Sequence, residues 1–157
     1  MVLNNSTSSR KKCILLVEDN PEDYETTLRA FKKAGVTNPV HRCEDGEDAL
    51  DYLFQRGEYS DPKSAPQPGI ILLDLNLPGT DGRQVLAEIK NDENLKQIPV
   101  VVLTTSTDPR DIRECYKSGA NSYIQKPVDL VGFTKAIEML SGYWLDMTIL
   151  PEMADEL

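Results

Sequence analysis

The sequence has few cysteines, few aromatic residues, one histidine and no long apolar run. Its three cysteines, Cys13, Cys43 and Cys115, are widely spaced and form no CxxC pair, which favours reduced thiols over a disulfide framework or a zinc site. The longest apolar run, Cys13–Val17, is far shorter than the roughly 20 residues that cross a membrane. Residues 1–12 are polar and lack the apolar segment of a secretory signal, so we expect a cytoplasmic protein that does not insert into membranes.

Positive charge is also scarce. The chain has 17 Lys and Arg against 26 Asp and Glu, a net charge of -9. Nucleic acids and anionic membranes repel such a protein on average, so we expect neither as a direct partner. What the chain does have is apolar material: 39% of its 157 residues are hydrophobic, enough for the core of one domain and too many for a disordered chain.

Short apolar runs alternate five times with amphipathic segments. The runs predict strands at Cys13–Val17, Val40–Cys43, residues 70–75, Val100–Thr104 and Ser122–Gln125. The segments between them predict helices, each with a capping side chain at its start: Asn20, Asp45, Asp81, Asp108 and Asp129. Regular alternation of strand and helix predicts an α/β fold, with a parallel sheet covered by helices on both faces.

Chemically active side chains follow the strand ends. Glu18 and Asp19 follow the first strand, Asp74 ends the third, Thr104 ends the fourth and Lys126 follows the fifth. Because ligands of parallel α/β sheets bind beyond the carboxyl ends of the strands, we expect these groups to share one cleft. Each carboxylate alone could instead be a helix cap, but that does not explain the whole set with its lysine. Crowded carboxylates without nearby His or Cys favour a hard cation such as Mg²⁺.

Four ordered motifs carry a family resemblance: LLVEDN at 15–20, LDLNLPGTDG at 73–82, VLT at 102–104 and KP at 126–127. Together they resemble the receiver domain of two-component response regulators over residues 12–142. This resemblance implies a flavodoxin-like fold, a doubly wound five-stranded parallel sheet in the order 2-1-3-4-5 with five helices. We therefore expect a flexible N-terminus (1–11), a receiver domain (12–145) and a C-terminal tail (146–157).

Within that family, residues 18–24, the long segment 56–68 and the lack of an output domain are most similar to the stand-alone response regulators of cyanobacterial and other bacterial phytochromes. The resemblance implies phosphorelay signalling with a sensor histidine kinase, here of the phytochrome type, as partner. It also implies a phospho-acceptor switch that catalyses its own phosphorylation and slow dephosphorylation, rather than an enzyme acting on a separate substrate.

The resemblance also assigns roles to the residues of the cleft. Asp74 would be the phospho-acceptor, and Mg²⁺ or Mn²⁺ would be held by Asp19, Asp74 and the backbone carbonyl of Asn76. Glu18 stands where many members have Asp, a difference that would let it reach the ion through water. Lys126 would bind a phosphoryl oxygen, and the family places a cis peptide bond between it and the following proline.

Thr104 and Tyr123 would form the switch. The Thr104 hydroxyl would move to the phosphoryl group, and the ring of Tyr123 would fill the vacated space. This movement would reshape the face formed by the fourth and fifth helices, through which we expect a homodimer together with the tail. Apolar tail residues support that expectation, although they could instead pack on their own domain: Leu145, Met147, Ile149, Leu150 and Met153.

Two other functions share the α/β pattern. A phosphohydrolase that forms an aspartyl phosphate needs an acid two residues after its nucleophile to protonate the leaving group, and Asn76 occupies that position. A flavin-binding electron carrier needs a hydroxyl- and glycine-rich loop after the first strand, where residues 18–23 are instead strongly anionic. Both are disfavoured, and a colourless purified protein would exclude the flavin.

Overall fold

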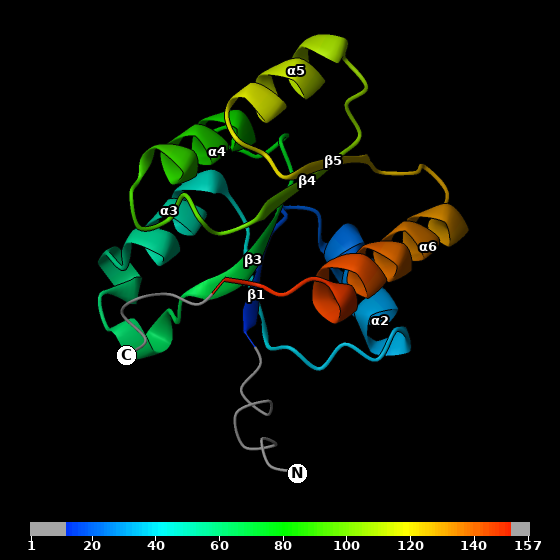
Figure 1. Cartoon of the computed structure of the whole chain (residues 1–157), viewed down its shortest axis with the longest axis horizontal. Coiled ribbons are helices and arrows are strands. Elements are labelled where there is room, and N and C mark those ends of the chain that lie inside the picture. The colour runs from blue at the N-terminus through cyan, green and yellow to red at the C-terminus, as the bar shows by residue number, and fades with distance from the viewer. Residues whose placement is uncertain (1–11, 152–157) are drawn as a thin grey trace.

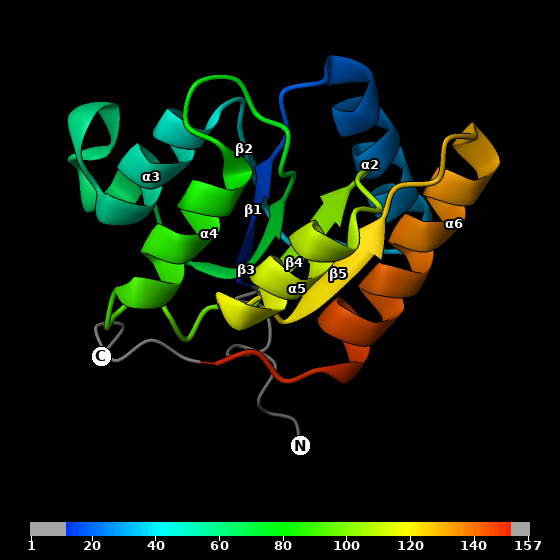
Figure 2. The same cartoon turned by 90° about the horizontal axis from the view of Figure 1, so that it is seen from above.

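A five-stranded parallel sheet forms the centre of the molecule, in the order β2-β1-β3-β4-β5. The computed structural model describes residues 12–151. Helices α2 and α6 cover one face of the sheet, and α3, α4 and α5 cover the other (Figures 1 and 2). The flavodoxin-like topology expected from the family resemblance is therefore confirmed.

Four of the five strands have the bounds predicted from the apolar runs: β1 Cys13–Val17, β2 Val40–Cys43, β4 Val100–Thr104 and β5 Ser122–Gln125. The third strand, β3 Pro68–Leu73, begins and ends two residues earlier than predicted. It ends early because the chain turns at Leu75, whose carbonyl accepts hydrogen bonds from the backbone N–H groups of Leu77 and Gly82. Asp74 thus lies just beyond the strand.

The predicted helices all form: α2 Pro21–Lys33, α3 Gly46–Phe54, α4 Gly82–Asn91, α5 Pro109–Lys117 and α6 Leu130–Ser141. Each predicted cap side chain accepts a hydrogen bond from a backbone N–H in the first turn of its helix. A π-helical turn, η3 Gly142–Met147, extends α6. None of the helices in residues 12–151 is long and apolar enough to span a membrane.

The long segment 56–68 is packed against the domain. It contains two short 3₁₀ helices, η1 Gly57–Tyr59 and η2 Pro62–Ser64. The fully buried Tyr52 of α3 donates a hydrogen bond of 2.8 Å from its hydroxyl to the carbonyl of Pro66, and its ring contacts those of His41 and Tyr59. These contacts anchor the segment to α3 and β2.

The tail divides its apolar side chains between the core and the surface. Leu145 and Leu150 pack against the core on the α2–α6 side of the sheet, whereas Met147 and Ile149 are exposed. Intramolecular packing therefore explains the burial of two of these side chains, and the other two remain exposed. Met153 and residues 1–11 lie outside the described residues.

Lys90 of α4 joins two loops, the α4–β4 and α5–β5 connections, at the edge of the sheet opposite to Asp74. Its Nζ donates hydrogen bonds to the carbonyls of Lys96 and Ile98 and to Oδ1 of Asn121, at 2.9, 2.7 and 3.3 Å. Burial lowers the pKa of this ammonium. We expect Lys90→Met to lower the free energy of unfolding by about 2 kcal/mol, because carbonyls in this half-buried site lose a charged donor. Urea denaturation measures the change.

The matched control is Lys96→Met, because the Lys96 ammonium is exposed and pairs with Glu93. An exposed pair of this kind contributes about 0 to 1 kcal/mol. Equal effects of the two substitutions would contradict the structural role of Lys90.

Candidate functional site

The carboxyl ends of four neighbouring strands bring together the predicted site residues. The parallel register pairs Val17 with Leu73, Leu73 with Val102 and Thr104 with Gln125, so the residues that follow the strands become neighbours. Four polar side chains are buried there: Glu18, Asp74, Thr104 and Lys126. The structure therefore brings these side chains together, as expected from the order of the strands, in a buried cluster.

Lys126 is the centre of this cluster. Its Nζ lies 2.6 Å from Oε1 of Glu18, 2.9 Å from Oδ2 of Asp74 and 2.9 Å from Oδ2 of Asp23. Its backbone N–H donates to the carbonyl of Thr104 at 2.7 Å, which fixes the end of β5 beside β4. The peptide bond between Lys126 and Pro127 is trans, so the cis bond implied by the resemblance is wrong for this structure.

Burial and the charge of the neighbouring partner have opposite effects on the pKa values of Glu18 and Lys126, the two most buried ionisable groups of the cluster. Burial raises the pKa of Glu18 to about 7, although the hydrogen bond and charge of Lys126 oppose the rise, and the charge of Asp74 adds to it. For Lys126, burial alone would lower the pKa. The hydrogen bond to Glu18 and the charges of Glu18 and Asp74 outweigh that effect, so its pKa is raised and the ammonium stays charged.

Three carboxylates of the cluster fit a divalent cation. Glu18, Asp19 and Asp74 each offer one oxygen atom, and these oxygens lie within 4.8 Å of one another; no other such group occurs in residues 12–151. Asp19 is exposed, so an ion can reach the site from solvent. An all-oxygen set suits Mg²⁺ or Mn²⁺. The backbone N–H of Asn76 donates to Oδ1 of Asp74, and the expected ligand role of its carbonyl stays a prediction.

The two predicted switch residues lie on β4 and β5. Thr104 is fully buried, and its Oγ1 accepts a long hydrogen bond of 3.4 Å from the side-chain amide of Asn76. Tyr123 is half-buried, and its hydroxyl donates to the carbonyl of Ser106 at 3.0 Å. The aromatic side chain is thus tied to the connection that follows Thr104. Its movement on phosphorylation stays a prediction.

Two residues at the site were missed by the sequence analysis. Asp23 was included only within the anionic residues 18–23, yet it pairs with Lys126. Arg42 of β2 donates hydrogen bonds to the carbonyls of Glu18 and Asp19 and so fixes the backbone of the acidic pair. The early start of α2 was a usable signal for Asp23, because the first turn of a helix that directly follows β1 lies over the carboxyl edge of the sheet.

Known proteins have sequences similar to this one. The model of the response regulator receiver domain family matches residues 14–138. Response regulator Rcp1 of Synechocystis sp. is 41% identical over 144 residues, which cover 92% of this chain and 96% of that protein. The probable methanogenesis regulatory protein FilR2 of Methanothrix harundinacea is 44% identical over 132 residues, 84% of this chain and 83% of that protein.

Two solved structures are similar over nearly the whole chain. The structure of the Mn²⁺-bound form of Rcp1 superposes with a TM-score of 0.85. The matched region covers 90% of this chain and 99% of the Rcp1 chain. The phosphorylated cyanobacterial phytochrome response regulator RcpA is 43% identical in sequence, and its structure superposes with a TM-score of 0.86. The matched region covers 91% of this chain and 100% of the RcpA chain. The family model matches most of the chain, and these homologues are similar over nearly all of it. The chain therefore belongs to the response regulator receiver domain family.

Proposed function

We propose that this receiver accepts a phosphoryl group on Asp74 from a sensor histidine kinase of the phytochrome type in the cytoplasm. The observation that carries the proposal is the buried contact between Asp74 and Lys126 beside the carboxylates of Glu18 and Asp19. The similarity to the phytochrome response regulator RcpA supports the choice of kinase.

The side chains of the cluster suit phosphoryl transfer. A carboxylate oxygen of Asp74 attacks the phosphorus of a phosphohistidine; an O–P bond forms, the P–N bond breaks and the histidine nitrogen keeps the electron pair. Lys126 places positive charge beside the transferred group, and the hydroxyl of Thr104 is a donor for one of its oxygens. When bound by Glu18, Asp19 and Asp74, Mg²⁺ or Mn²⁺ supplies further neutralisation of phosphoryl charge. The protein thus promotes its own phosphorylation and its slow reversal.

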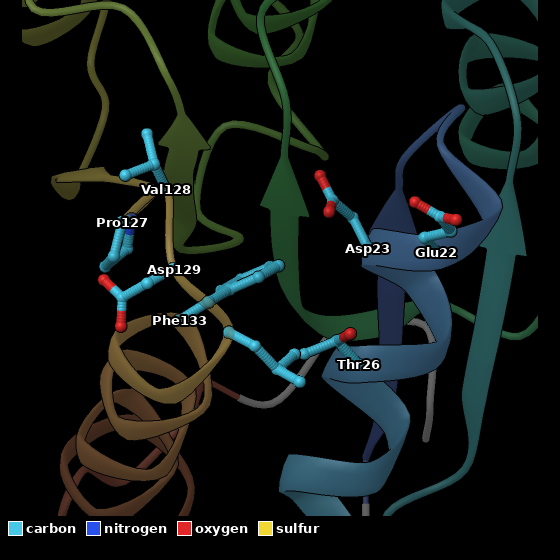
Figure 3. A pocket seen from close by; sticks show the side chains of 8 residues that line it. Glu22, Asp23, Thr26, Pro127, Val128, Asp129 and Phe133 are labelled. Carbon is cyan, nitrogen blue, oxygen red and sulfur yellow. The ribbon is translucent and has the colours of Figure 1, made fainter.

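A pocket beside Lys126 offers the kinase a place to dock. It has a volume of about 310 Å³ and lies between the start of α2 and the β5–α6 connection (Figure 3). Acidic groups of α2 form one wall, and Val128, Leu130 and Phe133 form much of the other. Val128 is 99% exposed, which suits an apolar contact with a protein rather than with water. A donor seated here lies next to the phospho-acceptor cluster.

Kinase choice can be tested by phosphoryl transfer. Purified phytochrome-type and unrelated histidine kinases, labelled on their histidine, are each mixed with the receiver in Mg²⁺. We expect transfer from the phytochrome-type kinase to be faster by a factor of about ten or more, because pairing depends on complementary surfaces. Equal rates from all kinases would contradict this pairing, while labelling of Asp74 itself would still support phospho-acceptance.

We further propose that a second copy of the chain covers the face formed by α5, β5 and α6. Movement of Thr104 and Tyr123 would change this face, and exposed apolar side chains lie on its helices and on the tail: Tyr116, Val131, Met139, Tyr143, Met147 and Ile149. A homodimer would bury them. Truncation after Gly142 is an unsuitable test, because it also removes Leu145 and Leu150 from the core.

Point substitutions test the dimer without opening the core. We expect Met139→Glu combined with Ile149→Ser to weaken dimerisation by a factor of about ten or more, because each places polar groups in a buried apolar contact. Sedimentation equilibrium measures the dissociation constant. Val128→Ser is the control, because this exposed residue lies beside the pocket. A wild-type protein that stays monomeric at high micromolar concentration, phosphorylated or not, would contradict the dimer.

A further inference from the structure

Asp23 connects the pocket with the phospho-acceptor cluster. It projects from the first turn of α2 toward the ends of the strands and forms part of the pocket wall (Figure 3). Its Oδ2 lies 2.9 Å from Nζ of Lys126. Glu22, the preceding residue, lines the same pocket but is exposed and is not among the partners of Lys126. Asp23 is therefore the residue of this wall that reaches the catalytic lysine.

All three donors of Lys126 are occupied in this arrangement. An ammonium group has three N–H bonds, and Nζ has three carboxylate partners, Glu18, Asp23 and Asp74. A phosphoryl oxygen that binds Lys126 therefore competes with these carboxylates for its N–H groups. The arrangement thus favours a partner exchange at Lys126 when the lysine contacts the phosphoryl group.

Of these three partners, Asp23 is the one most easily replaced. The side chains of Glu18 and Asp74 are 4% and 9% exposed, and that of Asp23 is 30% exposed. Water and salt screen the pair with Asp23 most, so it contributes least. Glu18 also makes the shortest contact, and Asp74 carries the phosphoryl group and keeps it beside the lysine.

We propose that Asp23 is a positioning residue that holds Lys126 in the unphosphorylated arrangement, and that its ion pair with Lys126 is exchanged for a phosphoryl oxygen when Asp74 is phosphorylated. This inference rests on the proposed function. Because the ion pair exists only before phosphorylation, it stabilises the unphosphorylated state alone. Its removal lowers the cost of moving Lys126 to the phosphoryl group and so favours phosphorylation.

The test compares Asp23→Asn with the matched control Glu22→Gln. Both substitutions keep the side-chain shape and remove one negative charge from the same pocket wall, but only the first changes a partner of Lys126. Labelled acetyl phosphate in Mg²⁺ serves as donor, so kinase docking does not enter the measurement. We expect Asp23→Asn to be phosphorylated about two- to fivefold faster than wild type, the range that a partly exposed ion pair allows. Glu22→Gln should stay close to the wild-type rate.

A second measurement follows Lys126 directly, without metal or phosphate. In ¹⁵N-lysine-labelled protein, Asp23→Asn should shift the Nζ resonance of Lys126 and speed the exchange of its ammonium protons with water, and Glu22→Gln should leave both unchanged. A merely structural role of Asp23 would lower stability without accelerating phosphorylation.

Phosphorylation of Asp23→Asn at or below the rate of Glu22→Gln would overturn the proposed exchange, while phosphorylation of the wild type would still support the function. Failure of the wild type to accept label would overturn the function and the exchange together.

Discussion

Asp74→Asn should abolish phosphoryl acceptance, with labelling by a kinase or by acetyl phosphate reduced at least about a thousandfold. The amide oxygen of asparagine is neutral and cannot replace the carboxylate as nucleophile. The fold should persist, because the amide can still accept from the N–H of Asn76 and Lys126 keeps Glu18 and Asp23. Without Mg²⁺, the free energy of unfolding should hold or rise, since one of several crowded carboxylates has lost its charge.

Asp81→Asn is the control for this variant. Asp81 is also a carboxylate of the β3–α4 connection, but it caps α4 and pairs with Arg83, away from Lys126. It should keep normal labelling. Wild-type labelling of Asp74→Asn, or loss of labelling in Asp81→Asn with an intact fold, would refute the assignment of the phospho-acceptor.

The second large effect is expected for Lys126→Met. This substitution should reduce phosphorylation strongly, and at pH 8 it should also lower the free energy of unfolding by about 3 kcal/mol. The reason is that Glu18, whose side chain is 4% exposed, loses its buried counter-ion. Urea denaturation in metal-free buffer with a chelator measures the change in stability.

The stability deficit of Lys126→Met should shrink as the pH falls. Burial already raises the pKa of Glu18 to about 7 in the wild type, and loss of Lys126 removes the hydrogen bond and the charge that oppose the rise most strongly. A carboxyl with a raised pKa in the folded state binds its proton there more readily than in the unfolded chain, so stability increases as the pH falls toward the unfolded pKa of about 4.5. This gain is larger in the variant. Equal deficits at pH 5 and pH 8 would contradict the account, and adding Glu18→Gln should restore much of the stability at pH 8.

Local signals made most of the fold predictable. Continuous apolar runs are typical of strands buried on both faces, and a capping side chain such as Asn20 fixes a helix start through hydrogen bonds within a few residues. The end of β3 was less predictable, because Leu75 is as apolar as the strand before it. Its position outside the strand depends on the turn that returns the chain to Gly82.

The site was predictable where topology alone determines proximity. Residues that follow parallel strands meet at one edge, so Asp74 and Lys126 could be placed together from the order of the motifs. The contacts of Asp23 and Arg42 could not be predicted from the order of the motifs. They depend on the direction of each side chain and on how close helix α2 and the edge strand β2 lie to the cluster. The same holds for the tail, where composition indicated burial of Leu145 and Leu150 but not the surface that buries them.

The packing of the tail has a practical consequence for protein engineering. A Cβ atom placed on Gly69 would collide with the side chain of Lys12 and lie 3.2 Å from Leu150, so the two ends of the described chain meet at the start of β3. Asp74 and Lys126 lie at the other edge of the sheet. In a version of the protein limited to the described residues, a short linker can therefore join these two ends, and new termini can be opened in a surface loop. Such a circular permutant could be tethered to a biosensor surface in several orientations, each leaving the phospho-acceptor open to its donor.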